Sequence, residues 1–242
     1  MIARRQALRI GSTAAAAAAL TGCGFHFDHV ATGKTETDLV NFDKDKAEMV
    51  RLDIQMPAGE LKVHGGSNKL MEGQFRYNVP EWKPEVRYDS TGFRGTLSIK
   101  QGGRGGASGN ITNEWDVRLA EDVPLDIEVR MGAGEGKLDL RNLTLRNVEI
   151  HIGAGEMDVD LRSAPKRSFE LIMRGGVGEG TVRVPRDASV IAEAKGGIGS
   201  INVTGLRKTG NSTWESESYG KNKATIRVDV KGGIGEINIR AE

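Results

Sequence analysis

One short motif recurs along the chain and constrains its fold more than any other feature. Residues 127–140 (IEVRMGAGEGKLDL) align without a gap on residues 148–161 (VEIHIGAGEMDVDL), 21 positions later. A third copy lies at 171–184, and shorter copies lie at 57–63, 197–203 and 233–239. A repeat of this length cannot bury an apolar face alone, so successive copies must stack on one another.

Apolar and polar residues alternate on both sides of the Gly-x-Gly turn in each copy. In one copy the apolar residues are Val148, Ile150, Ile152, Met157, Val159 and Leu161. A period of two is typical of a β-strand with one buried face, and the glycines supply the backbone conformations of a sharp turn. We therefore predict an all-β domain, a stacked-rung β-solenoid (parallel β-helix-like) with a Gly-x-Gly turn in every rung.

Two stretches depart from the repeat. Residues 64–126 lack Gly-x-Gly but keep strand patterns, which predicts either degenerate rungs or a sheet that caps one end of the solenoid. Residues 204–222 lengthen the interval between the last two copies to 36 residues, which predicts an excursion, a hairpin, between rungs. The solenoid domain is expected to span residues 48–242.

The N-terminus has the plan of a bacterial export signal followed by a lipid-attachment site. Arg4 and Arg5 lie in a basic segment, six alanines follow, and Leu-Thr-Gly precedes Cys23, the only cysteine of the chain. This pattern predicts that residues 1–22 are a cleaved lipoprotein signal peptide and that Cys23 carries acyl chains such as palmitate. The arginine pair resembles a twin-arginine export motif, and Sec export is the alternative.

The segment after the signal is expected to connect lipid and domain. Residues 23–47 are polar and aperiodic, which predicts a lipid anchor and a flexible tether. Each buried methylene of an acyl chain contributes about 0.8 kcal/mol to membrane binding. We therefore expect an exported protein whose partner is a bacterial membrane, reached through the acyl chains on Cys23, with the domain outside the cytoplasm.

Composition and charge exclude several classes of protein. Without residues 1–22 the chain has 31 basic and 33 acidic residues, a formal net charge of −2, so it lacks the basic excess that nucleic-acid binding needs. One cysteine permits neither an internal disulfide nor a Cys-based zinc site. The 33 glycines follow no Gly-X-Y period, which excludes collagen. We expect no nucleic-acid partner, no metal and no cofactor.

A glutamate follows the turn in five of the six copies. These residues are Glu60, Glu135, Glu156, Glu179 and Glu236, with Ser200 as the exception. Rungs in register would bring neighbouring carboxylates to about 4.8 Å, so the charges need compensation. The first interpretation is hydrogen bonding from the turn glycines or pairing with Lys62, Lys137 and Arg183. The second is a row of weak cation sites at Glu135, Glu156 and Glu179.

No catalytic motif is present in the sequence. Residues 132–137 lack the spacing of a phosphate-binding loop, and neither a serine-hydrolase nor a zinc-protease motif occurs. Outward carboxylates such as Glu149, Asp158 and Asp160 could lie at the spacing of a glycosidase pair. We therefore expect a non-catalytic protein, with an envelope carbohydrate hydrolase as the alternative.

Several separated motifs resemble one family in the same order. The motifs are LDIQMPAGELKVHGG at 52–66, GQFRYNV at 73–79, WKPEVRY at 82–88 and NEWDVRL at 113–119. They are similar to the toast-rack domain of bacterial envelope proteins, a group that includes the cell-wall-active-antibiotics response proteins. The C-terminal segment 205–237 is also similar to related adhesin-type domains. The resemblance covers about residues 48–242.

The resemblance implies a stacked β fold and an envelope role, and it brings no catalytic residues. The best-known members attach through transmembrane helices and restrain a sensor kinase, whereas this chain has a lipid-attachment pattern instead. We therefore expect an exported, lipid-anchored solenoid that presents a surface to an envelope protein or polymer, in envelope stress response or adhesion.

Overall fold

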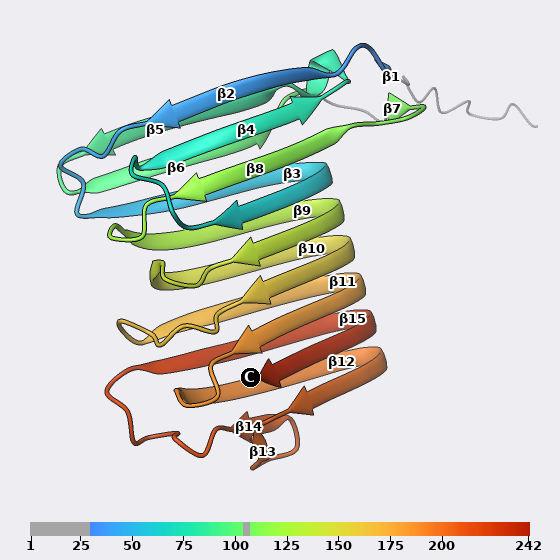
Figure 1. The fold of residues 1–242 in the computed structure, drawn as a ribbon. Helices are drawn as coiled ribbons and strands as arrows, with labels where there is room; N and C mark the ends of the chain where they lie inside the picture. The colour runs from blue at the N-terminus through green and yellow to red at the C-terminus, as the bar shows by residue number, and fades with distance from the viewer. Residues whose placement is uncertain (1–29, 104–106) are drawn as a thin grey trace, which may run out of the picture.

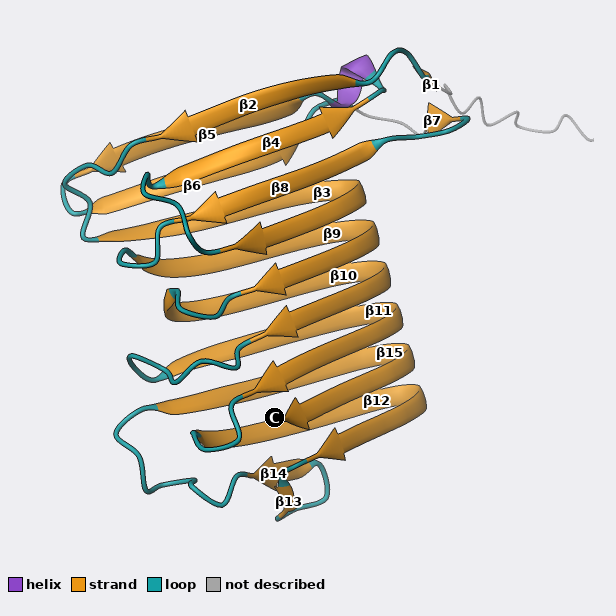
Figure 2. Ribbon diagram, in the orientation of Figure 1, coloured by secondary structure: helices purple, strands orange, loops and turns teal. Residues whose placement is uncertain are grey.

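The structure is a computed structural model that describes residues 30–103 and 107–242. Nearly all of this part of the chain lies in strands or the loops between them, and its helical element is a 3₁₀ turn, η1, at Pro80–Trp82 (Figure 2). The predicted signal peptide 1–22, with Arg4 and Arg5, and the predicted lipid-attachment residue Cys23 lie outside the described residues. No helix in the described ranges is both long enough and apolar enough to cross a bilayer.

The strands fall into a long class of 16 or 17 residues and a short class. The long strands are β3 Met49–His64, β9 Pro124–Asp139, β10 Thr144–Asp160, β11 Phe169–Val184, β12 Ser189–Thr204 and β15 Thr225–Ala241. The short strands are β1 Val30–Ala31, β2 Glu36–Phe42, β4 Met71–Tyr77, β5 Pro84–Thr91, β6 Arg94–Gln101, β7 Ala107–Ser108, β8 Asn113–Leu119, β13 Arg207–Lys208 and β14 Thr213–Glu215.

The six long strands are the rungs of a solenoid. Each rung runs out as a first arm, bends sharply and returns as a second arm (Figure 1). The bend is Gly-x-Gly in five rungs and Pro57-Ala58-Gly59 in β3. Neighbouring rungs pair in parallel along both arms and keep one register, so that Val148 of β10 pairs with Ile127 of β9 and with Leu171 of β11. The predicted all-β, stacked-rung β-solenoid is confirmed.

The two arms of each rung enclose a thin aliphatic core. In β10, Val148 and Ile150 of the first arm and Val159 of the second arm are completely buried. Small and large residues face each other across neighbouring rungs, for example Gly136 of β9 and Met157 of β10. A Cβ atom added to Gly136 would lie 2.5 Å from Cε of Met157. The core therefore leaves no room for a larger side chain at position 136 while Met157 keeps its place.

The bend requires glycine because it combines an unusual backbone conformation with a very close contact. Gly155 has a φ of 128°, which L-residues with a side chain rarely adopt. A Cβ atom added there would lie 1.9 Å from the carbonyl oxygen of Gly134 in the rung above. The same pairing of bend glycines recurs down the stack, which explains why the motif is repeated.

The last two rungs are not stacked in chain order. β15, the final strand, lies between β11 and β12 (Figure 1). The reason is the predicted hairpin in 204–222, which is confirmed: β13 pairs with β14, and β14 covers the outer edge of β12 at residues 191–193. Because the hairpin covers that part of the outer edge, the returning chain joins the inner edge of β12.

A separate cap closes the N-terminal end of the stack. Beyond β3 the two layers continue without a bend: β6 and β5 extend the layer of first arms, and β8, β4 and β2 extend the layer of second arms. The cap buries large rings, with Phe75 and Trp115 edge to face at 5.6 Å between centroids. Of the two predictions for residues 64–126, the capping sheet is correct.

The predicted flexible tether over residues 23–47 is wrong for residues 36–42. These residues form β2, which pairs antiparallel with the whole of β4. Val40 and Phe42 pack against the core, while Leu39 on the opposite face is 75% exposed. β2 is an edge strand that, among the described strands, pairs only with β4, and one of its faces packs against the core. Two apolar side chains are enough to hold that face, so most of the remaining residues of the strand are polar.

Candidate functional site

The six bends form a row along one edge of the solenoid (Figure 1). The residue that precedes the glycine of positive φ at the bend is alanine in β3, β9 and β10, namely Ala58, Ala133 and Ala154. In the three adjacent rungs β11, β15 and β12 it is Val177, Ile234 and Ile198, which pair in this order and are 54%, 51% and 73% exposed. We call these three residues the apolar ridge. Contiguous exposed apolar side chains of this kind mark sites of contact with another molecule.

Glycines open a small pocket behind the apolar ridge. The inward position before the bend holds Met131 and Ile152 in β9 and β10, but Gly175, Gly232 and Gly196 in the next three rungs. The pocket has a volume of about 80 Å³ and is partly lined by Ile201 and Ile237. Ile201 is 37% exposed because no rung covers the second arm of β12. The ridge and the pocket together concentrate accessible apolar surface at this end of the solenoid.

The glutamates that follow the turn are aligned as the sequence predicts. Glu60, Glu135, Glu156, Glu179 and Glu236 pair in register down the stack, and Ser200 ends the column. This register confirms the predicted alignment and places the carboxylates close enough to one another that their charges need compensation.

The compensation found in the structure comes mainly from neutral side chains. Glu179 accepts hydrogen bonds from Nδ2 of Asn238 at 2.9 Å and from Oγ1 of Thr181 at 3.2 Å. Glu236 accepts one from Nδ2 of Asn202 at 2.5 Å. Lys137 approaches Glu135 only to 3.9 Å. For Glu179 and Glu236, amide and hydroxyl groups from the same rung or the next one therefore replace part of the hydration that the carboxylates lose.

The described residues offer no multidentate cation site. Within ranges 30–103 and 107–242, no group of three or more His, Cys, Asp or Glu side chains is placed to hold a metal ion. Hard cations favour several oxygen ligands at once. The weak cation sites at Glu135, Glu156 and Glu179 remain a prediction that no contact in this part of the chain supports.

Each carboxylate considered for hydrolysis is held by a neighbouring basic side chain. Nε2 of His151 lies 2.8 Å from Oε1 of Glu149, and Arg183 binds Asp158. The hydrogen bond with His151 lowers the pKa of Glu149. A glycosidase acid needs the opposite, a raised pKa that keeps its proton near neutral pH.

Asp160 is constrained in the same way. Burial raises its pKa, but hydrogen bonds from Arg162 outweigh this effect and leave the pKa lowered. Nη2 of Arg162 lies 2.7 Å from Oδ2 of Asp160, and Arg141 approaches the same oxygen at 3.6 Å. The surrounding groove is lined by His64, two aliphatic side chains and charged residues of both signs, and its lining in the described part of the chain includes no Trp, Tyr or Phe ring on which a sugar could stack. This arrangement suits a solvated, ion-paired face better than a hydrolase site.

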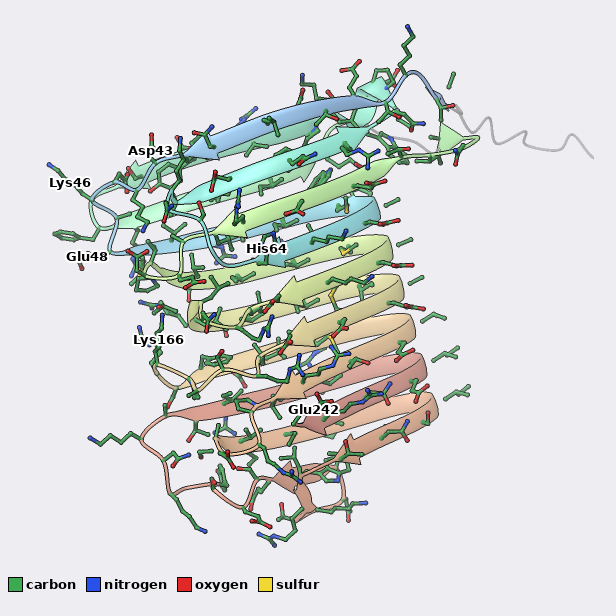
Figure 3. All side chains as sticks on the ribbon, in the orientation of Figure 1. Asp43, Lys46, Glu48, His64, Lys166 and Glu242 are labelled. Carbon is green, nitrogen blue, oxygen red and sulfur yellow. The ribbon has the colours of Figure 1, made fainter. Side chains whose placement is uncertain are left out.

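Both arms of the solenoid carry side chains of both charges, and nitrogen and oxygen atoms are interspersed over the view in Figure 3. On the second arms, Nε2 of His64 lies 2.8 Å from Oδ1 of Asp116. On the first arms, the buried Glu128 binds both Arg51 and Arg130. Because each sign is interleaved with the other, these contacts do not build the basic face that nucleic-acid binding requires.

The apolar ridge is the feature that sequence reasoning missed. Its signal is the change from alanine to Val177, Ile234 and Ile198 between the paired glycines. The period-two pattern does not flag this position, because the bend points it away from both faces of the strand.

Two family models match the chain. Residues 31–183 match the family described as the N-terminal domain of toast_rack, DUF2154. Residues 133–239 match the family described as cell wall-active antibiotics response LiaF, C-terminal. No curated protein matches the chain.

Solved structures also resemble the chain. A candidate cell adhesion protein from Clostridium sporogenes is 34% identical, with a TM-score of 0.84 over 86% of this chain and 100% of that chain. A candidate adhesin from Bacteroides fragilis is 10% identical, with a TM-score of 0.33 over 87% of this chain and 99% of that chain. The first similarity is close in both sequence and structure, whereas the second is too distant to support an argument.

Proposed function

The chain belongs to the toast-rack family, and from this premise we propose that it is a non-catalytic, lipid-anchored cell-envelope protein. Its solenoid presents a surface to an envelope protein or polymer. The match to the antibiotics-response family supports a role in envelope stress, and the similarity to the Clostridium sporogenes protein supports adhesion.

The observation that carries this proposal is the apolar ridge. Val177, Ile234 and Ile198 lie on adjacent rungs, more than half exposed, on a scaffold with in-register backbone pairing. Rigid bends hold the three side chains in a row before any partner arrives, so little conformational entropy is lost on binding. The ridge is therefore the proposed contact site for the envelope partner.

Alanine substitution of the ridge tests this contact. The variant Val177→Ala/Ile234→Ala/Ile198→Ala restores the residue that three other rungs already carry at the same place, so it should fold. Crosslinking and pull-down from membranes should recover a partner with the wild type and lose it with the triple variant. The control is Leu39→Ala, which removes an exposed apolar side chain from the cap and should leave recovery unchanged.

The proposed anchor is tested separately at Cys23. Replacement of Cys23 by serine removes the thiol that acylation needs, so metabolic labelling with palmitate should be lost. The cleaved, acylated form should also be absent from the membrane fraction. Continued labelling of Cys23→Ser would contradict the anchor and leave the ridge untouched.

The hydrolase alternative has its own decisive result. The non-catalytic reading fails if the wild type recovers no partner and the purified protein cleaves envelope glycans. Asp160→Asn should then abolish cleavage, because Asp160 is one of the outward carboxylates proposed for that chemistry.

A further inference from the structure

The last rung of the solenoid has an edge that the described chain covers only in part (Figure 1). β12 pairs with β15 along its inner edge. On its outer edge, β14 covers residues 191–193, and the N–H of Ala194 donates to the carbonyl of Ser212. Within ranges 30–103 and 107–242, residues 195–204 pair with β15 alone. We call residues 195–204 the open edge.

The open edge lacks the features that usually prevent strand pairing. Lys195, which pairs with Glu193, is the one charged residue of the open edge; residues 196–204 contain no charged side chain, and Ile198 and Ile201 are exposed. The edge strand β2 at the other end of the molecule instead carries Glu36 and Asp38, and Asp38 pairs with Lys83 at 3.0 Å. Charges on an edge strand disfavour pairing with another chain, and a neutral, apolar edge favours it.

Ser200 marks the open edge as different from every other rung. All five remaining rungs carry glutamate at this place, and the nearest, Glu236, pairs with Ser200 in register. A strand added to the open edge would lie about 4.8 Å away, so a carboxylate at position 200 would face that strand directly. With serine at position 200, no charge lies beside the nearest residue of an added strand.

The chemistry of the open edge fits its own copy. A two-fold contact places the same surface on both partners, and residue i of one copy meets residue j of the other, so only residues near the axis meet their own kind. Antiparallel pairing of residues 195–204 with the same residues of a second copy would place the axis between residues 199 and 200, which brings the two copies of Ser200 close together. Asn202 already continues a chain of side-chain amides, because its Nδ2 donates to Oδ1 of Asn238 at 3.1 Å and Asn238 donates to Glu179. Both Nδ2 hydrogens of Asn202 are used by Glu236 and Asn238, so its Oδ1 is the atom that can accept a hydrogen bond from an added strand.

We propose that two copies of this chain associate through their open edges. The hairpin β13–β14 restricts the contact to the bend and the second arm of β12. Backbone N–H and C=O groups of residues 195–204 pair across the interface, and Ile201 with the pocket behind the apolar ridge becomes covered. The open edge shares Ile198 with the apolar ridge, but the association uses neither Cys23 nor an envelope partner, and a substitution at Ser200 tests it with all three ridge side chains in place.

A charge at position 200 tests the association. Light scattering of the purified full-length chain should give the mass of a dimer. Ser200→Glu should fold, because five rungs carry glutamate there, but it should weaken the dimer by roughly tenfold or more through like-charge repulsion. Asn211→Glu adds the same charge to the exposed hairpin loop and should leave the dimer intact. Mixing Ser200→Glu with Ser200→Lys chains should restore a dimer.

A thiol probe tests the same contact in membranes. Ser200→Cys should form an interchain disulfide between two copies under mild oxidation. Thr37→Cys places an exposed thiol on the opposite edge strand β2 and should remain monomeric. A monomeric wild type would overturn the proposal, as would a dimer unaffected by Ser200→Glu. Crosslinking of Ser200→Cys to a different protein would show that the edge binds an unlike strand, and would also overturn it.

Discussion

A methyl group at one bend should separate two sources of instability in the solenoid. Gly155→Ala keeps the sequence otherwise intact and adds only a Cβ atom. The residue has a φ of 128°, and holding alanine in such a conformation costs about 1–3 kcal/mol. The new Cβ atom would also lie 1.9 Å from the carbonyl oxygen of Gly134, so the two rungs must move apart by more than 1 Å at the bend.

The separation adds to the conformational strain. Displacement of the bend breaks about two ladder hydrogen bonds, each worth about 1 kcal/mol net. The total loss in the free energy of unfolding is therefore about 3–5 kcal/mol. Gly66→Ala is the matched control, because Gly66 has a φ of 98° but no atom within 4 Å of an added Cβ. It should show the strain alone.

Urea unfolding followed by circular dichroism measures both variants against the wild type. Linear extrapolation gives the free energy of unfolding in water. Gly155→Ala should be less stable than Gly66→Ala by about 2 kcal/mol, the contribution of the broken hydrogen bonds. Equal losses in the two variants would refute the reasoning, because the contact between rungs would then contribute nothing.

Two further predictions concern charge. A hydrogen bond from Arg141 lowers the pKa of Asp139, and the pKa of Asp160 is also lowered, so their stabilisation is present above about pH 4 and is lost as pH falls through the folded-state pKa values. The melting temperature should therefore drop less between pH 5 and pH 3 in Asp139→Asn/Asp160→Asn than in the wild type; an equal drop would contradict this assignment. Millimolar calcium should leave the melting temperature unchanged, because the described carboxylates form no multidentate site. A rise that Glu156→Gln abolishes would instead establish the cation sites.

The rungs were predictable because each copy repeats the same alternation around the same turn. The gapless alignment of residues 127–140 with 148–161 is the register found in space, including the pair Glu135 and Glu156. The order of the last rungs was not predictable, since residues 196–203 (GGIGSINV) and 232–239 (GGIGEINI) are nearly identical and fit β11 equally well. Their order depends on the hairpin, which acts through distant contacts.

Strand β2 of the cap and the partners of the aligned glutamates were also not predictable from the sequence. β2 was missed because its position at an edge, set by β4, leaves only Val40 and Phe42 to reveal the strand. The glutamate column follows from the repeat, but the partners of Glu179 and Glu236 do not. Those partners include Asn238 and Asn202, which come from neighbouring rungs and are identified only once the order of the rungs is known.

The position of β15 between β11 and β12 restricts the order in which the rungs can pair during folding. β15 follows β11 and β12 in the chain but lies between them, so each of these rungs lacks one parallel neighbour until residues 225–241 are synthesised. During that interval the similar turn of β12 can pair directly with β11 and occupy the place of the final strand. Correct assembly therefore requires β15 to pair with β11 before β12 does, or to displace β12 from β11. We expect a chain that stops before residue 225 to form a shorter rack in which β12 pairs with β11 in the place of β15.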